Sequence, residues 1–452
     1  MTPARLAAAR VLLAVDRGRT TLAAELERHR ASVDEDRDRA LLFELVAGTL
    51  RWRNELDALL SACTTRRLRT VDAPVLGALR LGAYQLTHLD RIPPHAVVHE
   101  SVELVRELGR ARATGFVNAV LRRLARGRPH GALPIRPEPT GSRVNQLAYL
   151  TTTLSHPAWL VERWLDRHGF EAAERWCQFN NESPDVTLRS HGRLTPLELV
   201  AALGRAGVAA APTRWVRDAV QVPPGSVSRI PPELTREIAI QDEASQIVAH
   251  AVGAESNERV LDACAAPGGK TVIMASDMQR RGVIVAADHR PGRLQVLRGV
   301  LDRAGITAPL VQIDASRALP FSAVFDAVLL DAPCSGLGTL RRDPDVKWAR
   351  HPADLATFAA TQRSMLAEVA AVVRPGGRLL YSTCSSEPEE NEHIVRAFLA
   401  SHADFSAAPA VPGPAVADAD QLVDDRGFLR TLPFKDGLDA FYAALLVRRQ
   451  AA

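Results

Sequence analysis

The stretch Val260-Leu-Asp-Ala-Cys-Ala-Ala-Pro-Gly-Gly-Lys270-Thr271 largely decides how this 452-residue chain is expected to fold. It begins with the short apolar run Val260–Cys264, which is typical of a buried strand, and it leads into a helical segment at Thr271–Met278. The small residues and glycines in between allow backbone N–H groups to approach a ligand at the start of that helix. The stretch therefore predicts a strand, a tight ligand-binding turn and a helix.

Two common nucleotide-binding motifs do not fit this turn. A P-loop requires a glycine five positions before Gly269, where this chain has Cys264. The dinucleotide motif G-x-G-x-x-G is absent as well. What remains is a turn for a ligand that has no pyrophosphate.

From Ile238 onward, short apolar runs alternate with helical segments. Helices are expected over Thr271–Met278, Leu294–Ala304 and Leu355–Val373. This alternation predicts a parallel, doubly wound sheet, whose ligands lie at the carboxyl ends of its strands. The expected strands are Val260–Cys264, Val283–Ala287, Leu310–Ile313, Ala327–Leu330, Leu379–Ser382 and Tyr442–Val447.

Carboxylates follow three of these strands. Asp288 ends the second strand, 20 residues after Gly268, where a carboxylate can bind ribose hydroxyls. Asp314 ends the third strand and Asp331 ends the fourth. A single such residue would be read as a cap for the next helix. Three in register after a glycine turn favour instead the layout of a Rossmann-like S-adenosylmethionine site.

Two cysteines follow neighbouring strand ends. Cys334 lies in Asp331-Ala-Pro-Cys-Ser-Gly and Cys384 in Tyr381-Ser-Thr-Cys-Ser, so both thiols are expected at the ligand edge of the sheet. A structural free cysteine is usually buried in an apolar strand, whereas Pro, Ser and Gly flank these two. The five cysteines are too few, too spread and odd in number for a disulfide framework, and the absence of a C-x-x-C pair excludes a zinc ribbon or a thioredoxin motif. We therefore expect two reduced, reactive thiols.

Methylation of a pyrimidine at C5 requires this set of groups. The C5 atom is a poor nucleophile until a thiolate adds at C6 and converts C5 into an enamine carbon. Base-assisted loss of the C5 proton then expels the thiolate, so that one hard step is split into two. A protonated carboxyl at cytosine N3 would stabilise the charge that develops on the ring.

Together, the turn and the two cysteine motifs resemble the RNA (cytosine-5)-methyltransferases. The resemblance implies that Cys384 is the nucleophile, that Cys334 assists product release and that Asp331 contacts the cytosine. DNA cytosine-5 enzymes use the Pro-Cys thiol as the nucleophile instead, and spacing alone does not settle which thiol attacks. For S-adenosylmethionine the implied binding residues, with Arg293 matched by its offset from Asp288, are Cys264, Ala265, Ala266, Pro267, Gly268, Gly269, Lys270, Asp288, Arg293, Asp314 and Asp331.

The first third of the chain is expected to be helical and basic. Residues 1–130 contain 22 Arg and 15 Asp plus Glu, a net charge of +7, whereas the remainder carries −3. Such an asymmetry favours a polyanionic partner. Basic residues at the end of the last helix also suit the helix dipole. Candidate phosphate contacts are Arg51, Arg53, Arg66, Arg67, Arg69, Arg122, Arg123, Arg126 and Arg128. Helices are expected around Leu6–Val15, Ala40–Leu50, Val75–Leu86, Val97–Leu108 and Phe116–Leu124.

Three segments of this helical part, namely Arg80–Leu86, Ile92–Glu100 and Gly115–Arg123, resemble the NusB-type RNA-binding fold. That fold ahead of a methyltransferase is similar to the RsmB, or Fmu/Sun, type of bacterial 16S ribosomal RNA cytosine-5 methyltransferase. The resemblance implies 16S ribosomal RNA as the partner. A transfer RNA substrate, or a non-catalytic antitermination-type RNA-binding protein, remains an alternative reading.

The expected organisation has four parts. Residues 1–128 form an all-α NusB-like bundle, and 129–150, rich in turn formers, form a linker. Residues 151–236 form a small α/β insert, and 237–452 form an α/β, Rossmann-like class I methyltransferase domain.

With no apolar run of about 18 residues and no signal peptide, a cytoplasmic protein is expected. No metal site is expected, because the His95/His99 pair would need a third ligand from elsewhere, follows Pro94 and is not part of an H-E-x-x-H motif. Protein partners stay open.

Overall fold

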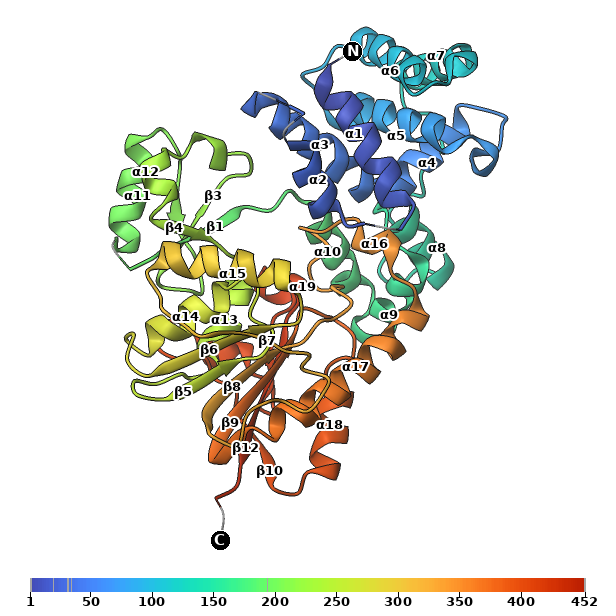
Figure 1. The fold of residues 1–452 in the computed structure, drawn as a ribbon. Helices are drawn as coiled ribbons and strands as arrows, with labels where there is room; N and C mark the ends of the chain where they lie inside the picture. Colours follow the sequence, from blue (N-terminus) through green and yellow to red (C-terminus); the bar gives the residue numbers. More distant parts are fainter. Residues whose placement is uncertain (1, 19, 31, 34, 193, 451–452) are drawn as a thin grey trace. The chain divides into compact units, whose positions relative to one another are not determined.

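The chain folds into two compact units, which are described separately (Figure 1). The computed structural model describes residues 2–18, 20–30, 32–33, 35–192 and 194–450. The helical unit comprises the described residues up to Glu182 together with Leu340–Arg350, and the sheet unit comprises Ser183–Thr339 and the described residues from His351 onward. Within these described ranges, no helix is both long and apolar enough to cross a membrane.

The N-terminal helical bundle buries one continuous apolar core. All five helices expected from the apolar periodicity are present. Two more, α2 and α4, were not predicted, because α2 has few large apolar residues and α4 follows α3 after the single residue Trp52. The elements are α1 (Pro3–Asp16), α2 (Leu22–Arg30), α3 (Asp36–Arg51), α4 (Arg53–Ala62), η1 (Leu68–Thr70), α5 (Ala73–His88), α6 (Pro94–Glu107), η2 (Ala111–Ala113) and α7 (Thr114–Ala125).

The helical unit continues beyond the bundle. The expected linker contains α8 (Arg143–Ala148), which is followed by η3 (Tyr149–Thr153), α9 (Ala158–His168) and α10 (Phe170–Asn181). Residues 151–182, which the sequence expectation places in the insert, lie in the helical unit, and the four-part division of the chain stays a prediction. The N–H of Asn54 in α4 donates to Ser155 Oγ at 2.9 Å and its Nδ2 to the carbonyl of Thr151 at 3.0 Å, which ties this segment to the bundle. Helices α9 and α10 then pack on each other, with the rings of Trp164 and Trp176 stacked at 4.6 Å.

A segment from the second half of the sequence also belongs to the helical unit. It is Leu340–Arg350, which contains the short helix α16 (Val346–Ala349). Lys347 Nζ donates to Asn181 Oδ1 at 2.9 Å, and Trp348 Nε1 donates to the carbonyl of Leu50 at 2.7 Å. Polar contacts therefore fix this segment among the helices, which no local sequence pattern predicted.

The sheet unit begins with a small antiparallel sheet in the order β2-β3-β1-β4. Strands β1 and β3 pair antiparallel, with Val186 opposite Val222 and Arg189 opposite Ala219. Their apolar residues and those of α11 form a separate core, so this segment is a small α/β insert. The elements are β1 (Val186–Ser190), α11 (Pro196–Arg205), β2 (Ala211–Pro212), β3 (Ala219–Val222), η4 (Val227–Arg229), α12 (Pro232–Thr235) and β4 (Ile238–Ile240).

The large sheet has the order β10-β12-β9-β8-β5-β6-β7, with β11 paired to β12. Strands β9, β8, β5, β6 and β7 are parallel, as expected. The parallel prediction was wrong for Tyr442–Val447, because β12 pairs antiparallel with β9. The strands are β5 (Arg259–Asp262), β6 (Val283–Asp288), β7 (Leu310–Gln312), β8 (Phe325–Asp331), β9 (Val373–Thr383), β10 (Phe405–Ala408), β11 (Leu429–Arg430) and β12 (Tyr442–Arg448).

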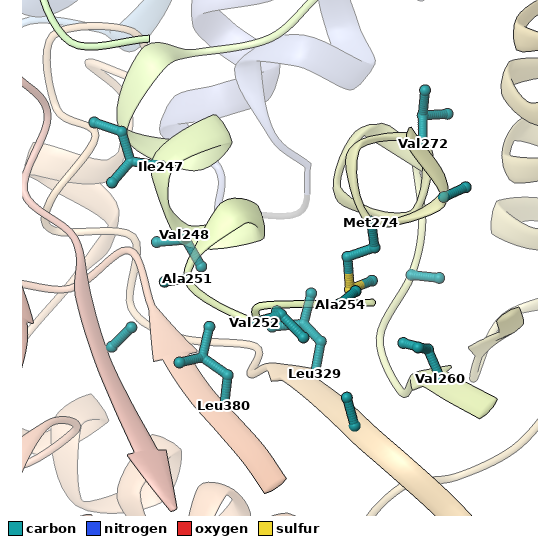
Figure 2. Close-up of a cluster of buried hydrophobic side chains, with 14 of the residues drawn as sticks. Ile247, Val248, Ala251, Val252, Ala254, Val260, Val272, Met274, Leu329 and Leu380 are labelled. Atoms are coloured by element: carbon teal, nitrogen blue, oxygen red, sulfur yellow. The ribbon is translucent and has the colours of Figure 1, made fainter. Parts of the chain in front are cut away.

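Helices cover both faces of the large sheet. Successive residues of a strand point to opposite sides, so each strand contributes side chains to both of the cores beneath these helices. Val260 and Leu380 join the core on the side of α13 and α14, which Figure 2 shows in close-up. Leu261 and Leu379 join the opposite core, under α17 and α18. This is the doubly wound arrangement that the strand–helix alternation predicts. The helices are α13 (Glu243–His250), α14 (Gly269–Asp277), α15 (Pro291–Ala304), α17 (Pro352–Ala370), α18 (Glu392–Ser401), η5 (Ala419–Leu422) and α19 (Pro433–Asp436).

Candidate active site

The turn between β5 and α14 depends on Gly268. This residue has a φ of +118°, a conformation that L side chains rarely adopt. A Cβ atom at Gly268 would lie 2.8 Å from Leu297 Cδ1 of α15, so the position also has no room for a side chain. The turn is therefore bare backbone at the N-terminus of α14, as the sequence predicted, and its N–H groups suit a polar ligand.

Asp288 and Arg293 are both tied to this turn. Asp288, at the end of β6, is buried, and its Oδ2 accepts from the N–H of Ala266 at 3.3 Å. Arg293 Nη2 donates to the carbonyl of Ala266 at 2.9 Å, and Nη1 lies 3.8 Å from Asp288 Oδ2. The structure thus brings three of the expected cofactor-binding positions together.

Asp314 lies in the loop after β7 and forms a local set of contacts. Its Oδ1 accepts from the N–H of Ser316 at 3.0 Å and from the hydroxyl at 2.6 Å, and Arg317 Nε is 3.3 Å from Oδ2. The Ser316 hydroxyl and N–H lower the pKa of this carboxyl. Asp314 is partly exposed, so its side chain could reach a ligand at this strand end.

Asp331, at the end of β8, is held by two donors. Lys270 Nζ donates to Oδ2 at 2.7 Å, and the Ser382 hydroxyl donates to Oδ1 at 2.9 Å. Burial by itself would lower the pKa of Lys270, but the charge of Asp331 and its hydrogen bond outweigh burial and raise it. Lys270, at the end of the turn between β5 and α14, and Asp331, at the start of the Pro-Cys loop, therefore form an ion pair.

A fourth carboxyl, Asp262, was not singled out in the sequence. It ends β5, is almost fully buried, and its Oδ2 accepts from the Thr271 hydroxyl at 2.7 Å. Burial raises the pKa of Asp262 to about 7, and the nearby charge of Asp331 also raises it. Its position inside the motif Asp262-Ala-Cys264 was the available signal, because strand-end carboxylates were recognised at the next three strands.

This raised pKa predicts a pH-dependent effect of Asp262→Asn on stability. Between about pH 4 and 7 the folded state keeps a proton that the unfolded state has lost, so the contribution of Asp262 to stability falls as pH rises. Asparagine does not titrate. Thermal unfolding should therefore show the variant gaining stability relative to wild type as pH rises from about 5 to 7, with a constant difference above that range.

Asp314→Asn serves as the control for this prediction. The pKa of Asp314 is lowered, so that carboxyl titrates below the tested range and its removal should give a constant difference. An Asp262→Asn difference that is equally constant across the range would contradict the prediction.

The two thiols of the neighbouring strand ends lie in direct contact. Residues Asp331 of β8 and Ser382 of β9 are register partners, and the loops that follow them bring Cys334 Sγ to 3.0 Å from Cys384 Sγ. Both cysteines are free thiols. Contact with the Cys334 thiol, together with burial, raises the pKa of Cys384 well above its ordinary value, whereas Lys270 lowers it.

The loop that carries Cys334 is closely fitted against the one that carries Cys384. The N–H of Gly338 donates to the carbonyl of Cys384 at 2.9 Å. A Cβ atom at Gly338 would lie 1.9 Å from the carbonyl oxygen of Ala440, so only glycine allows this approach. The two thiols therefore belong to one packed edge that also contains Asp331 and Lys270.

The acidic run Glu389-Glu390-Asn391-Glu392 contains two side chains that reach the cysteine loops, which the sequence analysis did not predict. A charge run normally marks a solvated helix start, and no role was assigned to it. In the structure Glu390 and Asn391 are buried and hydrogen-bonded to the cysteine loops. Only their position shortly after Cys384 could have pointed to them.

The residues at this edge fit a cofactor that carries both hydroxyls and charge. The turn at Gly268 presents bare backbone without a side chain, and the carboxylates of Asp288 and Asp314 are suitable acceptors for hydroxyl and amino groups. A metal cluster is a different matter. Among the described residues, no group of three or more His, Cys, Asp and Glu side chains is placed to hold a metal ion.

Family profiles match three consecutive parts of the chain. Residues 2–126 match the NusB family, and 156–226 match the ferredoxin-like domain of RsmF/B-like methyltransferases. Residues 249–447 match the profile described as 16S rRNA methyltransferase RsmB/F. The three matches follow the order in which the helical bundle, the small sheet and the large sheet occur.

Curated relatives align with nearly the whole chain. The probable ribosomal RNA small subunit methyltransferase B of Bacillus subtilis (strain 168) is 36% identical over 412 residues, 90% of either chain. The ribosomal RNA small subunit methyltransferase B of Pseudomonas putida is 34% identical over 457 residues, 99% of either chain. Among solved structures, the protein PH0851 has a TM-score of 0.79 over 99% of both chains at 24% identity, which shows a shared fold.

Proposed function

Because the chain belongs to the RsmB/F family of ribosomal RNA methyltransferases, we propose that it methylates C5 of a cytosine in 16S ribosomal RNA in the cytoplasm. The observation that carries the cytosine-C5 chemistry is the pair of free thiols, 3.0 Å apart. Methylation of an oxygen or an exocyclic nitrogen requires no thiol, whereas C5 becomes nucleophilic only after addition at C6.

In the proposed reaction, Cys384 is the nucleophile. Its thiolate adds to C6 of the cytosine, and C5 takes the methyl group from a sulfonium sulfur, which leaves as a thioether. Removal of the C5 proton by a base then breaks the C6–S bond and returns the thiolate. Lys270 lowers the pKa of Cys384 and so opposes the effects of burial and of Cys334. Cys334, in contact with the same sulfur, assists the release step.

Asp331 is proposed to hold the target base. Its carboxylate oxygens can accept hydrogen bonds from the exocyclic amino group of cytosine. The contacts from Lys270 and Ser382 fix the orientation of this carboxylate. Asp331 thereby determines where C6 lies relative to the Cys384 sulfur.

S-adenosylmethionine is the proposed methyl donor, and when bound it supplies an electrophilic methyl group. The turn from Cys264 to Lys270 would contact it through bare backbone, with Arg293 holding that turn by its bond to Ala266. Asp288 and Asp314 would accept hydrogen bonds from its polar groups. Because Gly268 and Arg293 fix the conformation of the turn, this binding surface is formed before the RNA binds.

Release of tritium from RNA labelled at cytosine C5 tests the proposal. The label leaves when the C5–H bond breaks, which requires addition at C6, so release that depends on S-adenosylmethionine and matches methyl transfer to 16S RNA supports the proposed chemistry and substrate. Release from transfer RNA alone would favour the transfer RNA alternative. Methyl transfer without tritium release would place the methyl group on another atom, and cofactor binding without transfer to either RNA would favour the non-catalytic RNA-binding alternative.

We propose that the helical unit contacts the RNA backbone through the loop between α4 and α5. Exposed Arg66, Arg67 and Arg69 line a hollow of about 510 Å³ together with Ser61, Thr64, Thr65 and Leu68. The Arg66 guanidinium lies 5.7 Å from the Phe116 ring centre, which places the start of α7 beside this loop. Guanidinium groups around an open hollow suit phosphates.

Two other candidates of the helical unit are excluded from this surface. Arg51 is buried and donates to the carbonyl of Arg341 at 3.1 Å. Arg53 is paired with Asp16 at 3.1 Å. Trp52, between these two arginines, stacks on the ring of His88 at 4.7 Å and packs against the core.

Replacing Arg66, Arg67 and Arg69 together with glutamine should weaken RNA binding most at low salt. Each lost phosphate contact lowers the slope of log K against log salt by about 0.7 to 0.9, so the triple variant should lose about 2 to 3 in slope. Binding to a 16S fragment at several salt concentrations measures this slope. The matched control replaces exposed Arg10, Arg91 and Arg175, which changes the charge equally. Equal slopes for both triple variants would contradict the proposed surface.

A further inference from the structure

Glu390 joins the two cysteine loops through a single buried carboxylate. Its side chain has no exposed surface. Oε1 accepts from the N–H of Ser335 at 2.8 Å and from Gln362 Nε2 at 3.0 Å, while Oε2 accepts from the hydroxyls of Ser335 and Ser385. Ser335 directly follows Cys334, and Ser385 directly follows Cys384. One side chain therefore bonds to the residue next to each thiol.

The surroundings of Glu390 are fixed by further bonds. Gln362 of α17 also donates to the carbonyl of Pro333 at 3.0 Å, which ties the Pro-Cys loop to that helix. The Tyr381 hydroxyl donates to the backbone carbonyl of Glu390 at 2.6 Å. Asn391 accepts from the Thr383 hydroxyl at 2.5 Å and donates to the carbonyl of Ser385 at 2.9 Å. The segment between β9 and α18 is therefore folded back onto the strand end.

A purely stabilising role does not account for a carboxylate at this place. A buried carboxylate loses its hydration, and this loss is compensated only if hydrogen bonds satisfy its oxygens. The four hydrogen-bonding groups around Glu390 are all neutral donors. Apolar residues of similar volume would hold two loops together without that cost. The carboxylate fixes positions as well, because each hydrogen bond holds its donor atom at a defined distance and angle from a Glu390 oxygen.

We propose that Glu390 is a positioning residue that fixes the separation of the Cys334 and Cys384 thiols by bonding to Ser335 and Ser385. The catalytic consequence rests on the proposed function, in which one thiol attacks C6 and the other assists release. The structural consequence, a fixed distance between two sulfurs, does not depend on the substrate.

The distance is tested by oxidative cross-linking of the full-length protein. Diamide takes up two electrons and two protons as two thiols form a disulfide, and mass spectrometry of the peptides quantifies the Cys334–Cys384 bond. Glu390→Ala should cross-link about tenfold more slowly than wild type, since a misplacement of about 1 Å has effects of this size or larger on reaction rates. Glu390→Gln keeps the shape, and both serine hydroxyls can turn to accept from its amide. It should therefore cross-link at close to the wild-type rate.

Two further variants complete the test. Glu392→Gln removes a carboxylate two residues away that pairs with Arg430 at 2.9 Å, so it should cross-link like wild type. Ser385→Ala removes only the hydroxyl that links Glu390 to the Cys384 loop, and it decides the matter if Glu390→Ala does not fold. Cross-linking of folded Glu390→Ala, or otherwise of Ser385→Ala, at the wild-type rate would overturn the proposal.

Methyl transfer separates a positioning role from a structural one. Glu390→Ala should lose at least about tenfold in kcat, with S-adenosylmethionine affinity unchanged, and Glu390→Gln should restore most of that loss. An unchanged kcat in Glu390→Ala would overturn the catalytic part. If wild type itself methylates no RNA while the cross-linking difference is found, the proposed function fails and the positioning role of Glu390 stands.

Discussion

Cys384→Ala is expected to form no covalent RNA adduct, whereas Cys334→Ala is expected to accumulate one. The reason is that the two sulfurs are in contact at 3.0 Å but serve different steps in the proposed reaction. Loss of the nucleophile prevents the C6–S bond, and methyl transfer should fall by about 10³-fold or more. Loss of the release helper leaves that bond intact. Denaturing gels of the variants with unmodified 16S RNA and S-adenosylmethionine measure the adduct directly.

Cys63→Ala is the matched control for the two thiol variants. This cysteine is a free, buried thiol of the helical unit, so its loss should leave adduct formation unchanged. The reverse pattern, with adduct in Cys384→Ala and none in Cys334→Ala, would assign the nucleophile to Cys334 and make the mechanism like that of the DNA enzymes. If neither variant forms an adduct, then 16S RNA is the wrong substrate or the catalytic roles assigned to the two cysteines are wrong.

Asp331→Asn is expected to reduce methyl transfer by about 100-fold, the typical cost of losing one polar group aimed at a reacting base. The substitution keeps the shape but removes the charge that Lys270 contacts at 2.7 Å. The charge of Asp331 is the strongest of the interactions that raise the pKa of Lys270, and burial acts in the opposite direction. Without Asp331 the pKa of Lys270 therefore falls. The methyl-transfer rate of the variant should then change with pH over a range in which the wild-type rate is constant.

Initial rates of methyl transfer across a range of pH measure this effect. Asp326→Asn is the control, since Asp326 lies at the opposite end of the same strand, β8, and pairs with Arg374. It should lower stability slightly and leave kcat unchanged. Equal kcat for Asp331→Asn and wild type would contradict a role of this carboxylate in holding the base.

Much of the fold could be predicted from the sequence, because its signals are local. The strand–turn–helix around Gly268 needed only an apolar run, a glycine turn and helical spacing, all within twelve residues. The prediction was wrong for the direction of β12, since apolar content is the same for a parallel and an antiparallel strand. Membership of the RsmB/F family, which the cysteine motifs indicated, is confirmed by the relatives.

The candidate site was predictable only in part. Strand ends that carry Asp331, Cys334 and Cys384 were expected to meet, because parallel strands end at one edge of a sheet. Their 3.0 Å thiol contact, the Asp331–Lys270 pair and the raised pKa of Asp262 depend on distances and burial, which spacing along the chain does not give. Glu390 was passed over because an acidic run is usually solvated.

The sequence by itself determined the secondary structure that positions the candidate site, the side chains that stand at its strand ends and the basic character of the helical third. Tertiary structure alone decided that Leu340–Arg350 folds with the helical unit and that Glu390 is buried between two cysteine loops. The physical reason is the range of the interactions. Periodicity and turn chemistry act between neighbours in the chain, whereas the bonds of Lys347 to Asn181 and of Glu390 to Ser335 join residues 166 and 55 positions apart.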